Sequence, residues 1–347
     1  MEKIKVGNRL IGEGEPCFII AEAGSNHDGK LVQAKKLIDI AIDAGVDAIK
    51  FQTFSPLDIV HKNIRSNVYG YKTEKKFWYQ ILEDLVLKRE WYPELFEYAK
   101  KNGIVFISTP SSLECAKFLL SIGVPAFKIA SMDLTYNSFL RGISKLGKPI
   151  ILSTGMGSLT EIEEAINNIS STGLDDIILM HCVSNYPALP KELNLLNIKT
   201  LKLAFGLPVG FSDHSLGITS SIVAVTLGAC VIEKHITISR KLKGPDHSFS
   251  LEPNELKKLV KEVRIAEESL GSYRRIISKN EKEKQYLYRR SIIAKKSIKK
   301  GEIIRQNSLI ISRPGNGLQP KFLDIIINTR AKRDIKAYKV LQWEDIL

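Results

Sequence analysis

VGFSDHSLGITSSIVAVTLGACVIEKHIT, the stretch from Val209 to Thr237, has the pattern of two buried strands joined by a helix. Short apolar runs lie at Leu207–Gly210 and Cys230–Ile232, and apolar residues recur at helical spacing between them. Two strands joined by a helix in this way are parallel, and they are commonly neighbours in one sheet.

A histidine beside a carboxylate follows each of these runs, in Asp213-His214 and in Glu233-Lys234-His235. Because the carboxyl ends of parallel strands meet at one edge of a sheet, we expect both imidazoles at the same edge. Two converging imidazoles indicate a divalent metal site with open coordination positions. The alternative is a pair of ordinary histidines, each hydrogen-bonded where its strand ends.

The alternation of apolar run and amphipathic segment extends over most of the chain. The predicted strands are Phe18–Glu22, Ala48–Thr53, Val105–Thr109, Ala126–Ser131, Ile150–Thr154, Ile177–His181, Val209–Ser212 and Cys230–His235. Eight strand and helix units predict an α/β protein with a (β/α)8 TIM barrel. A doubly wound open sheet is the alternative, but no GxGxxG motif follows the first strand.

The segment from Phe54 to Arg89 is longer than an ordinary connection between a strand and a helix. It contains an aromatic group made of Tyr69, Tyr71, Phe77, Trp78 and Tyr79. An insertion of this kind at the catalytic end of a barrel usually forms a lid or a wall of the pocket.

Three segments follow from the end of the barrel pattern. The last barrel helix is predicted at Asn254–Leu270, after Pro253, and Gly271-Ser272 ends it. We therefore predict a barrel domain over residues 1–271, a polar linker over 272–288 and a small domain over 289–347.

The composition is that of an ordinary globular protein, with 44% hydrophobic and 26% charged residues. No apolar run is long enough to span a bilayer and no signal-peptide pattern is present, so we expect a cytoplasmic protein without membrane partners. Cys17, Cys115, Cys182 and Cys230 are scattered and form no CxxC pair, which favours reduced thiols over disulfides or zinc.

The net charge of +13 is concentrated near the carboxyl terminus, where Glu281–Leu347 holds 16 Lys and Arg against 7 Asp and Glu. Such a tail could be a nucleic-acid-binding arm. Its lysines are interleaved with apolar residues, which favours a solvated basic face that attracts an anionic substrate.

Polar residues stand at the end of every predicted strand. They are Glu22, Asn26 and His27; Lys50 and Gln52; Ser108 and Thr109; Lys128 and Ser131; Ser153 and Thr154; His181, Ser184, Asn185 and Tyr186; Ser212 and His214; and Glu233 and His235. Lysine is rarely buried on an apolar strand without an anion. Lys50 and Lys128 therefore indicate a phosphorylated or carboxylated substrate, or alternatively structural ion pairs with Glu22 or Glu233.

These motifs resemble the sialic acid synthase family, which includes the legionaminic and pseudaminic acid synthases and spore-coat polysaccharide relatives. The resemblance runs from about residue 14 to the carboxyl terminus. It rests on FIIAEAGSNHDG (18–29), AIKFQTF (48–54), FISTP (106–110), FKIAS (127–131), ILSTGM (151–156), HCVSNYP (181–187), GFSDHS (210–215), EKHIT (233–237) and GPDHSFSLEP (244–253). SIKKGEII and SRPGNGL resemble the antifreeze-like (SAF) domain that closes these enzymes.

The resemblance implies condensation of phosphoenolpyruvate with an amino sugar, with Glu22, Lys50, Lys128, His214 and His235 as catalytic residues. His214 and His235 would bind Mn2+, or Mg2+ or Co2+. The phosphoenolpyruvate site would comprise Lys50, Gln52, Thr109, Lys128, Ser131, Ser153, Asn185 and Ser212. The sugar would contact Glu22, Asp133, Tyr186 and Asp246. The resemblance also implies a domain-swapped homodimer in which Arg313 reaches the partner's sugar.

The sequence departs from the family pattern near the sugar. Many members have Gly-Glu where this chain has Met132-Asp133, and Ser111 stands where an aromatic residue is common. The expected acceptor is N-acetylmannosamine, and the alternative is a diacetamido-trideoxyhexose. The motifs are also compatible with an aldolase or keto-acid synthase that uses a sugar phosphate, and with an inactive barrel that binds polysaccharide or nucleic acid.

Overall fold

A computed structural model describes residues 3–69 and 77–346. Its centre is a closed barrel of eight parallel strands in the order β10-β3-β4-β5-β6-β7-β8-β9. The strands are β3 Phe18–Gly24, β4 Ala48–Thr53, β5 Val105–Pro110, β6 Phe127–Ile129, β7 Ile150–Ser153, β8 Ile177–Cys182, β9 Val209–Asp213 and β10 Val231–His235. The predicted (β/α)8 barrel is confirmed, and the open-sheet alternative is wrong because β10 pairs with β3.

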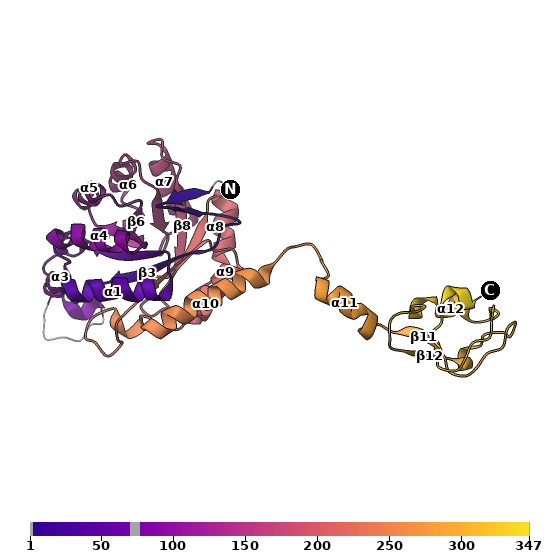
Figure 1. Ribbon diagram of the computed structural model, residues 1–347. Coiled ribbons are helices and arrows are strands. Elements are labelled where there is room, and N and C mark those ends of the chain that lie inside the picture. Colours follow the sequence, from indigo (N-terminus) through magenta and orange to yellow (C-terminus); the bar gives the residue numbers. More distant parts are fainter. Residues whose placement is uncertain (1–2, 70–76, 347) are drawn as a thin grey trace. The chain divides into compact units, whose positions relative to one another are not determined.

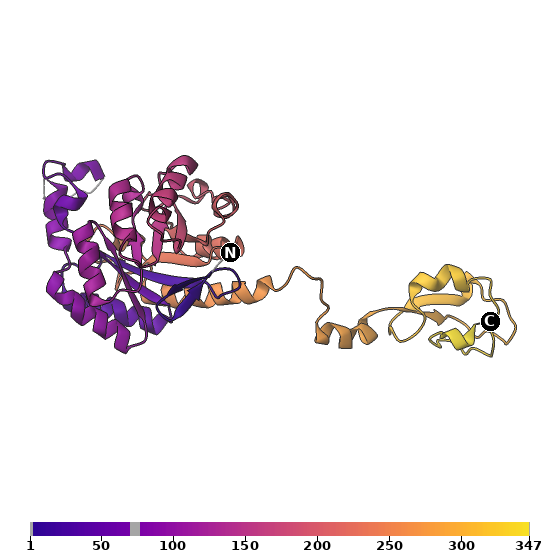
Figure 2. The same cartoon turned by 90° about the horizontal axis from the view of Figure 1, so that it is seen from above.

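Helices surround the strands, as Figures 1 and 2 show from two directions. They are α1 Leu31–Ala44, α4 Tyr92–Lys101, α5 Leu113–Ile122, α6 Asn137–Ser144, α7 Leu159–Ser170, α8 Asn197–Phe205, α9 Thr219–Thr226 and α10 Pro253–Leu270. The insertion after β4 forms α2 Pro56–Ile59 and α3 Trp78–Leu85, and Tyr71 lies outside the described residues.

The ends of individual elements follow from local sequence. Helix α1 stops at Gly45, whose left-handed φ of 73° a side chain would disfavour. Helix α7 begins at Ser158, which forms a capping box with Glu161. Strand β6 ends at Ile129, earlier than predicted, because the chain turns into a 3-10 helix at Ser131–Asp133.

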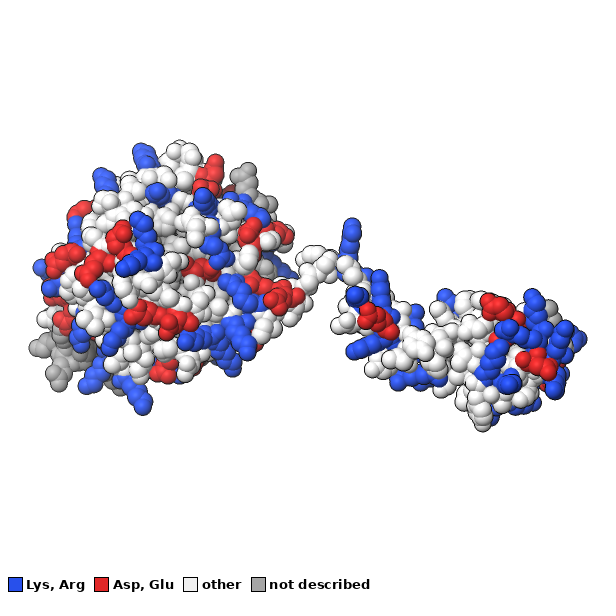
Figure 3. Space-filling view, in the orientation of Figure 1, with Lys and Arg blue, Asp and Glu red and all other residues white. Residues whose placement is uncertain are grey.

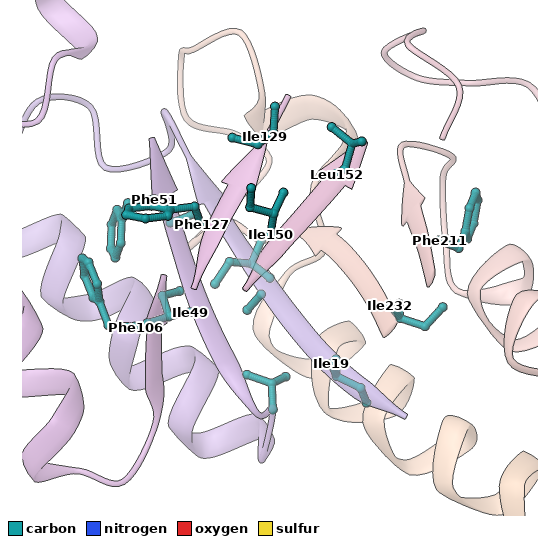
Figure 4. Close-up of a cluster of buried hydrophobic side chains, with 14 of the residues drawn as sticks. Ile19, Ile49, Phe51, Phe106, Phe127, Ile129, Ile150, Leu152, Phe211 and Ile232 are labelled. Atoms are coloured by element: carbon teal, nitrogen blue, oxygen red, sulfur yellow. The ribbon is translucent and has the colours of Figure 1, made fainter. Parts of the chain in front are cut away.

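Alternation along the strands divides the apolar residues between two layers. One face of each strand packs against the helices, and Figure 4 shows part of this layer, where the rings of Phe51 and Phe106 stack with centroids 5.4 Å apart. The other face fills the inside of the barrel, with Phe18, Ile107 and Ile178 among its buried residues. Burial of one such side chain contributes about 2 kcal/mol.

An amino-terminal hairpin, β1 Ile4–Val6 with β2 Arg9–Ile11, belongs to the inner apolar cluster of the barrel. Ile4, Val6 and Ile11 of the hairpin are buried there with the first residues of the barrel strands. This hairpin closes the amino-terminal end of the barrel, so the strands are open to a ligand at their carboxyl ends. The sequence analysis did not predict it.

Residues Ser272–Leu347 form a second compact unit, separate from Met1–Gly271. It contains α11 Lys279–Tyr288, β11 Ser291–Ala294, β12 Leu309–Ser312 and α12 Leu323–Ile326. Its own core includes Ile292, Ile304 and Leu341. Figure 3 shows Lys and Arg over much of the visible face of this unit, as the charge count predicts.

Two further expectations bear on the whole chain. The four cysteines are free thiols, with Cys230 partly buried and the other three buried, as predicted. Among the helices built from described residues, none has the length and apolar character needed to cross a membrane.

Candidate active site

A cavity of about 640 Å³ lies at the carboxyl ends of the barrel strands. Of the residues that the sequence analysis assigned to the site, Glu22, Lys50, Gln52, Thr109, Lys128, Ser131, Ser153, Tyr186, Ser212, His214, His235 and Asp246 line it. The strand register explains the convergence, because it places His235 beside Glu22 and Glu22 beside Lys50. Strands far apart in the sequence thus deliver these side chains to one place.

Two lysines and two glutamates form the charged floor of the cavity. Lys50 Nζ lies 2.8 Å from Glu22 Oε2, and the Nζ atoms of Lys50 and Lys128 are each 3.8 Å from Glu233 Oε1. All four side chains are buried. The predicted ion-pair alternative therefore holds in part, and the Glu233 carboxylate stands between the two ammonium groups.

The pKa shifts of this cluster follow from burial and from the neighbouring charges. Burial alone would lower the pKa of Lys50, but Glu22 and Glu233 outweigh it and raise that pKa. Burial lowers the pKa of Lys128. The Glu233 charge opposes this lowering only in part. Burial would raise the pKa of Glu233, yet Lys128 and Lys50 lower it to about 2. The carboxylate is therefore ionised near neutral pH.

Hydroxyl groups surround the lysines. Lys128 Nζ donates to Ser153 Oγ at 2.5 Å, and Lys50 Nζ donates to Thr109 Oγ1 at 3.1 Å. Gln52 Nε2 donates to Glu22 Oε1 at 2.8 Å. Ammonium and hydroxyl donors gathered around one space suit a phosphate or carboxylate group.

The two imidazoles lie on neighbouring strand ends, with ring centroids 5.6 Å apart. His214 Nδ1 lies 2.9 Å from the carbonyl oxygen of Val183, which can only accept, so Nδ1 carries the proton and Nε2 keeps a lone pair. Burial, and then His235, lower the pKa of His214 to about 4, so the ring is neutral near pH 7.

These residues fit a divalent metal, because neutral imidazoles are its usual nitrogen ligands. His235 Nδ1 is buried without a hydrogen-bond partner among the described residues, and it lies 3.8 Å from Asp246 Oδ2. No group of three or more His, Cys, Asp or Glu side chains suited to a metal occurs within residues 3–69 and 77–346. A bound ion would therefore keep positions for water or substrate.

Aromatic and acidic side chains form the part of the cavity beside the imidazoles. The ring of Tyr186 lies 4.2 Å from that of His214, and the ring of Phe249 lies 5.1 Å from that of His235. Asp246 Oδ2 accepts a hydrogen bond of 3.0 Å from Ser25 Oγ. Ser25 and Phe249 were not predicted as site residues.

The insertion supplies an apolar wall, as the sequence analysis predicted. Ile59 on α2, and Trp78, Leu82 and Leu85 on α3, line the cavity together with Phe54. Trp78 belongs to the aromatic group that suggested this role. The cavity thus has a polar floor at the strand ends and apolar residues contributed by the insertion.

Three predicted site residues lie elsewhere. Asn185 is exposed and donates to Glu192 at 3.3 Å, and Ser184 lines the cavity instead. Asp133 is the last residue of the 3-10 turn and is buried outside the cavity lining, and its neighbour Met132 lines the cavity.

The third is Arg313, which lies in the second unit. It packs over the ring of Tyr288 at 5.2 Å from the ring centroid. The predicted contact between Arg313 and a sugar stays a prediction.

The remaining histidines of the barrel have ordinary structural contacts. His181 Nε2 lies 2.7 Å from the carbonyl oxygen of Leu193, and His247 lies between Thr237 and Asp28. Burial lowers the pKa of His27 to about 4. Of the two histidines for which ordinary hydrogen bonding was the alternative, His214 has such a contact with Val183, whereas His235 Nδ1 has no hydrogen-bond partner among the described residues.

The fold and the site together define a (β/α)8 barrel with two buried lysines and two adjacent imidazoles in a cavity at its carboxyl end. Residues 37–275 match the NeuB family and residues 289–347 match the SAF domain. The chain belongs to the NeuB family, and the predicted resemblance is confirmed.

Relatives of this family span almost the whole chain. An uncharacterised protein of Methanocaldococcus jannaschii is 45% identical over 347 residues, covering 100% of this chain and 99% of that protein. The N,N'-diacetyllegionaminic acid synthase of Campylobacter jejuni is 44% identical over 91% of this chain and 97% of its own length. The crystal structure of N-acetylneuraminic acid synthetase from Leptospira borgpetersenii superposes with a TM-score of 0.74 at 37% identity, covering 82% of this chain and 95% of the other.

Proposed function

We propose that this protein condenses phosphoenolpyruvate with an N-acetylated amino sugar, giving a nonulosonic acid and phosphate. The observation that carries the proposal is the placement of two buried lysines, with their hydroxyl partners, beside the imidazoles of His214 and His235 in one cavity. The names of the relatives, which include acid synthases of this kind, support it. We place the reaction in the cytoplasm.

The donor would occupy the polar floor. Lys50, Lys128, Thr109 and Ser153 would bind the phosphate and carboxylate groups of phosphoenolpyruvate, because they already form a paired set of cationic and hydroxyl donors. When phosphoenolpyruvate binds, its anionic groups would replace the Glu22 and Glu233 carboxylates as partners of the two lysines. The main contribution of these residues is then to hold the donor in position.

The metal would be Mn2+, with Mg2+ or Co2+ as alternatives, and His214 and His235 would hold it. When bound, such an ion polarises the aldehyde oxygen of the open-chain sugar. The surrounding side chains would orient the sugar, with Tyr186 and Asp246 beside the imidazoles and Glu22 beside Lys50.

The proposed reaction makes one carbon–carbon bond and one carbon–oxygen bond to water, and it breaks the carbon–oxygen bond to phosphate. The methylene carbon of phosphoenolpyruvate attacks the sugar aldehyde, and the aldehyde oxygen takes up a proton. Water then adds to the cationic carbon that carries the phosphate and loses one proton, which leaves a hydroxyl group on that carbon. Phosphate departs with the bonding electron pair as this hydroxyl loses its proton, which leaves the 2-keto acid. Glu22 is the candidate for positioning or proton transfer, because its buried carboxylate lines the cavity and contacts Lys50 and Gln52.

The apolar residues that line the cavity bear on the choice of acceptor. N-acetylmannosamine is the acceptor that the sequence analysis favours. The apolar side chains of Ile59, Trp78, Leu82 and Leu85 also suit the methyl groups of a second acetamido substituent and of a deoxy carbon. This feature, and the legionaminic acid synthase relative, support a diacetamido-trideoxyhexose as the second candidate.

Purified protein incubated with phosphoenolpyruvate, Mn2+ and each sugar tests the proposal. We expect phosphate release and a 2-keto acid with one of the two acetamido sugars, and no product from His214→Ala or His235→Ala. Activity on a sugar phosphate alone would favour the keto-acid synthase alternative. A lack of phosphate release with every acceptor would reject the proposal.

The second unit would act in a homodimer. We propose that it exchanges between subunits and brings Arg313 to the sugar of the partner, as the resemblance implies. The exposed Arg313 guanidinium and the excess of basic residues in this unit support a role toward an anionic or polar ligand.

A further inference from the structure

A buried ion pair stands directly behind the two imidazoles. Asp213 and Lys234 are register partners on β9 and β10, and Lys234 Nζ lies 3.0 Å from Asp213 Oδ2. The preceding outward residues, Phe211 and Ile232, belong to the layer between strands and helices. Because side chains alternate along a strand, Asp213 and Lys234 face that layer, while His214 and His235 face the cavity.

The surroundings of the pair leave no charge unmatched. Asp213 Oδ1 accepts from the backbone N–H and the Oγ of Ser215 at 2.8 and 2.7 Å, and Asp213 Oδ2 accepts from Ser221 Oγ at 2.6 Å. Lys234 Nζ also donates to the carbonyl oxygen of Ser215. The side chains of Lys234 and Asp213 are 1% and 0% exposed, so these are the partners that replace water.

This network fixes the chain on both sides of His214. Asp213 and Ser215 flank His214 in the sequence, and both contact Lys234. Lys234 in turn directly precedes His235. Ser221 joins helix α9 to the same carboxylate. The His214 ring itself also makes a hydrogen bond to the carbonyl oxygen of Val183, which follows strand β8. The Asp213–Lys234 contact therefore links the chain beside His214 to the chain beside His235, in addition to the pairing of β9 with β10.

We propose that Asp213 and Lys234 are positioning residues that set the separation of the His214 and His235 imidazoles for a shared divalent cation. The inference rests on the proposed function, since it needs both imidazoles to bind the same ion. Replacing groups that hydrogen-bond and orient metal ligands typically changes metal affinity by 10- to 100-fold, and an effect near the lower end is expected here because the pair acts through the backbone.

The competing interpretation is that the pair only stabilises the fold. Asp47 offers a matched control, because it is also a buried carboxylate with two arginine partners, Arg9 and Arg264. It precedes β4, at the end of the barrel remote from the cavity, and accepts from the backbone N–H of Ile19 at 2.8 Å. Asp47→Asn should lower stability without changing metal affinity.

The test measures Mn2+ affinity from the electron paramagnetic resonance signal of free Mn2+, with no substrate present. Asp213→Asn and Lys234→Met should bind Mn2+ at least about ten-fold more weakly than the unaltered protein. The Co2+ absorption spectrum of the same variants should change, since it reports ligand geometry. Asp47→Asn should keep both the affinity and the spectrum. Circular dichroism and thermal unfolding identify the variants that fold.

The outcomes separate this inference from the proposed function. Absence of binding of Mn2+, Mg2+ and Co2+ by the unaltered protein would reject the shared metal, and the inference with it. Normal Mn2+ affinity in a folded Asp213→Asn protein would reject the inference alone. Should neither charge variant fold, Ser221→Ala decides: a several-fold loss of affinity supports the positioning role, and an unchanged affinity overturns it.

Discussion

Gly155 lies against three side chains of the cavity lining, which leave no room for a side chain at this position. A Cβ atom there would lie 2.6 Å from Cys182 Sγ and from Ser184 Oγ, and 2.8 Å from Ser131 Oγ. Gly155→Ala must therefore displace residues of the donor floor. We expect the KM for phosphoenolpyruvate to rise about ten-fold, because small misplacements at a binding site are costly. Steady-state kinetics with varied phosphoenolpyruvate measures it.

The same substitution at Gly142 is the control for Gly155→Ala. There the nearest atoms to a new Cβ belong to the flexible end of Leu113, at 3.2 Å, and the site is on helix α6. Gly142→Ala should leave the KM for phosphoenolpyruvate unchanged. Equal effects of both substitutions would show that the Gly155 change acts through general destabilisation.

Asp133 makes the stability of the fold depend on pH. Burial raises the pKa of this carboxyl from 3.8 to about 6, with Lys128 opposing the shift, and Asp133 Oδ2 has no hydrogen-bond partner among described residues. The folded state therefore favours the protonated acid. The contribution of the Asp133 carboxyl to the free energy of unfolding is fully present below pH 4, and it is lost as the pH rises through 6.

Asp133→Asn should remove this dependence. At pH 7.5 the free energy of unfolding of the variant should exceed that of the unaltered protein by about 3 kcal/mol, since no charge has to be buried. The difference should shrink toward zero at pH 4, where both side chains are neutral. Urea unfolding at the two pH values measures it, and a difference independent of pH would contradict the assignment.

The residues of the floor could be predicted from sequence because they continue the alternation of regular strands. Lys50, Lys128 and Ser212 are inside strands, so their direction follows from their neighbours. Ser184 and Asn185 follow the end of β8 at Cys182, where alternation no longer applies. For this reason the sequence could not decide which of the two faces the cavity.

At the scale of elements, the helices after β4 give the cavity its apolar side. Leu82 on α3 is buried and lines the cavity. Leu82→Asn should raise the KM for the acceptor about ten-fold, more for a diacetamido-trideoxyhexose than for N-acetylmannosamine, because apolar contact is lost. The KM for phosphoenolpyruvate should stay within about two-fold of its usual value, since the donor floor lies on other elements.

A matched substitution on α8 isolates this effect. Leu203 is 86% exposed and lies outside the lining of the cavity, so Leu203→Asn should change neither KM. Initial rates with each acceptor at saturating phosphoenolpyruvate compare the two variants. An equal increase of the KM for both acceptors in Leu82→Asn would argue against selection between the acceptors by the apolar wall.

Most barrel elements could be predicted from apolar periodicity, whereas the hairpin strands β1 and β2 and helix α11 of the second unit could not. Strands β1 and β2 have three residues each, too few for a periodic signal, although Gly7-Asn8 between them is a typical hairpin turn. Helix α11 lies within the predicted linker and has no buried residue. Its sequence signal is the capping box of Ser278 and Glu281, which apolar periodicity does not detect.

At the scale of the whole molecule, the chain consists of two units that each have a hydrophobic core. The barrel unit contains the complete set of charged floor residues and both imidazoles. The second unit contributes Arg313, the one predicted sugar contact outside the barrel. The proposed exchange between subunits therefore predicts that each active site is made from two chains.

Mixing of two inactive variants tests this arrangement. His235→Ala disables the barrel but keeps Arg313, and Arg313→Ala keeps the barrel but removes the sugar contact. In an exchanged two-fold dimer, the mixed dimer has one site in which both residues are intact. Random mixing should therefore restore about a quarter of the activity, because half of the dimers are mixed and each has one of two sites intact. If Arg313 served the barrel of its own chain, no mixture would gain activity, and size-exclusion chromatography with light scattering would confirm that mixed dimers had formed.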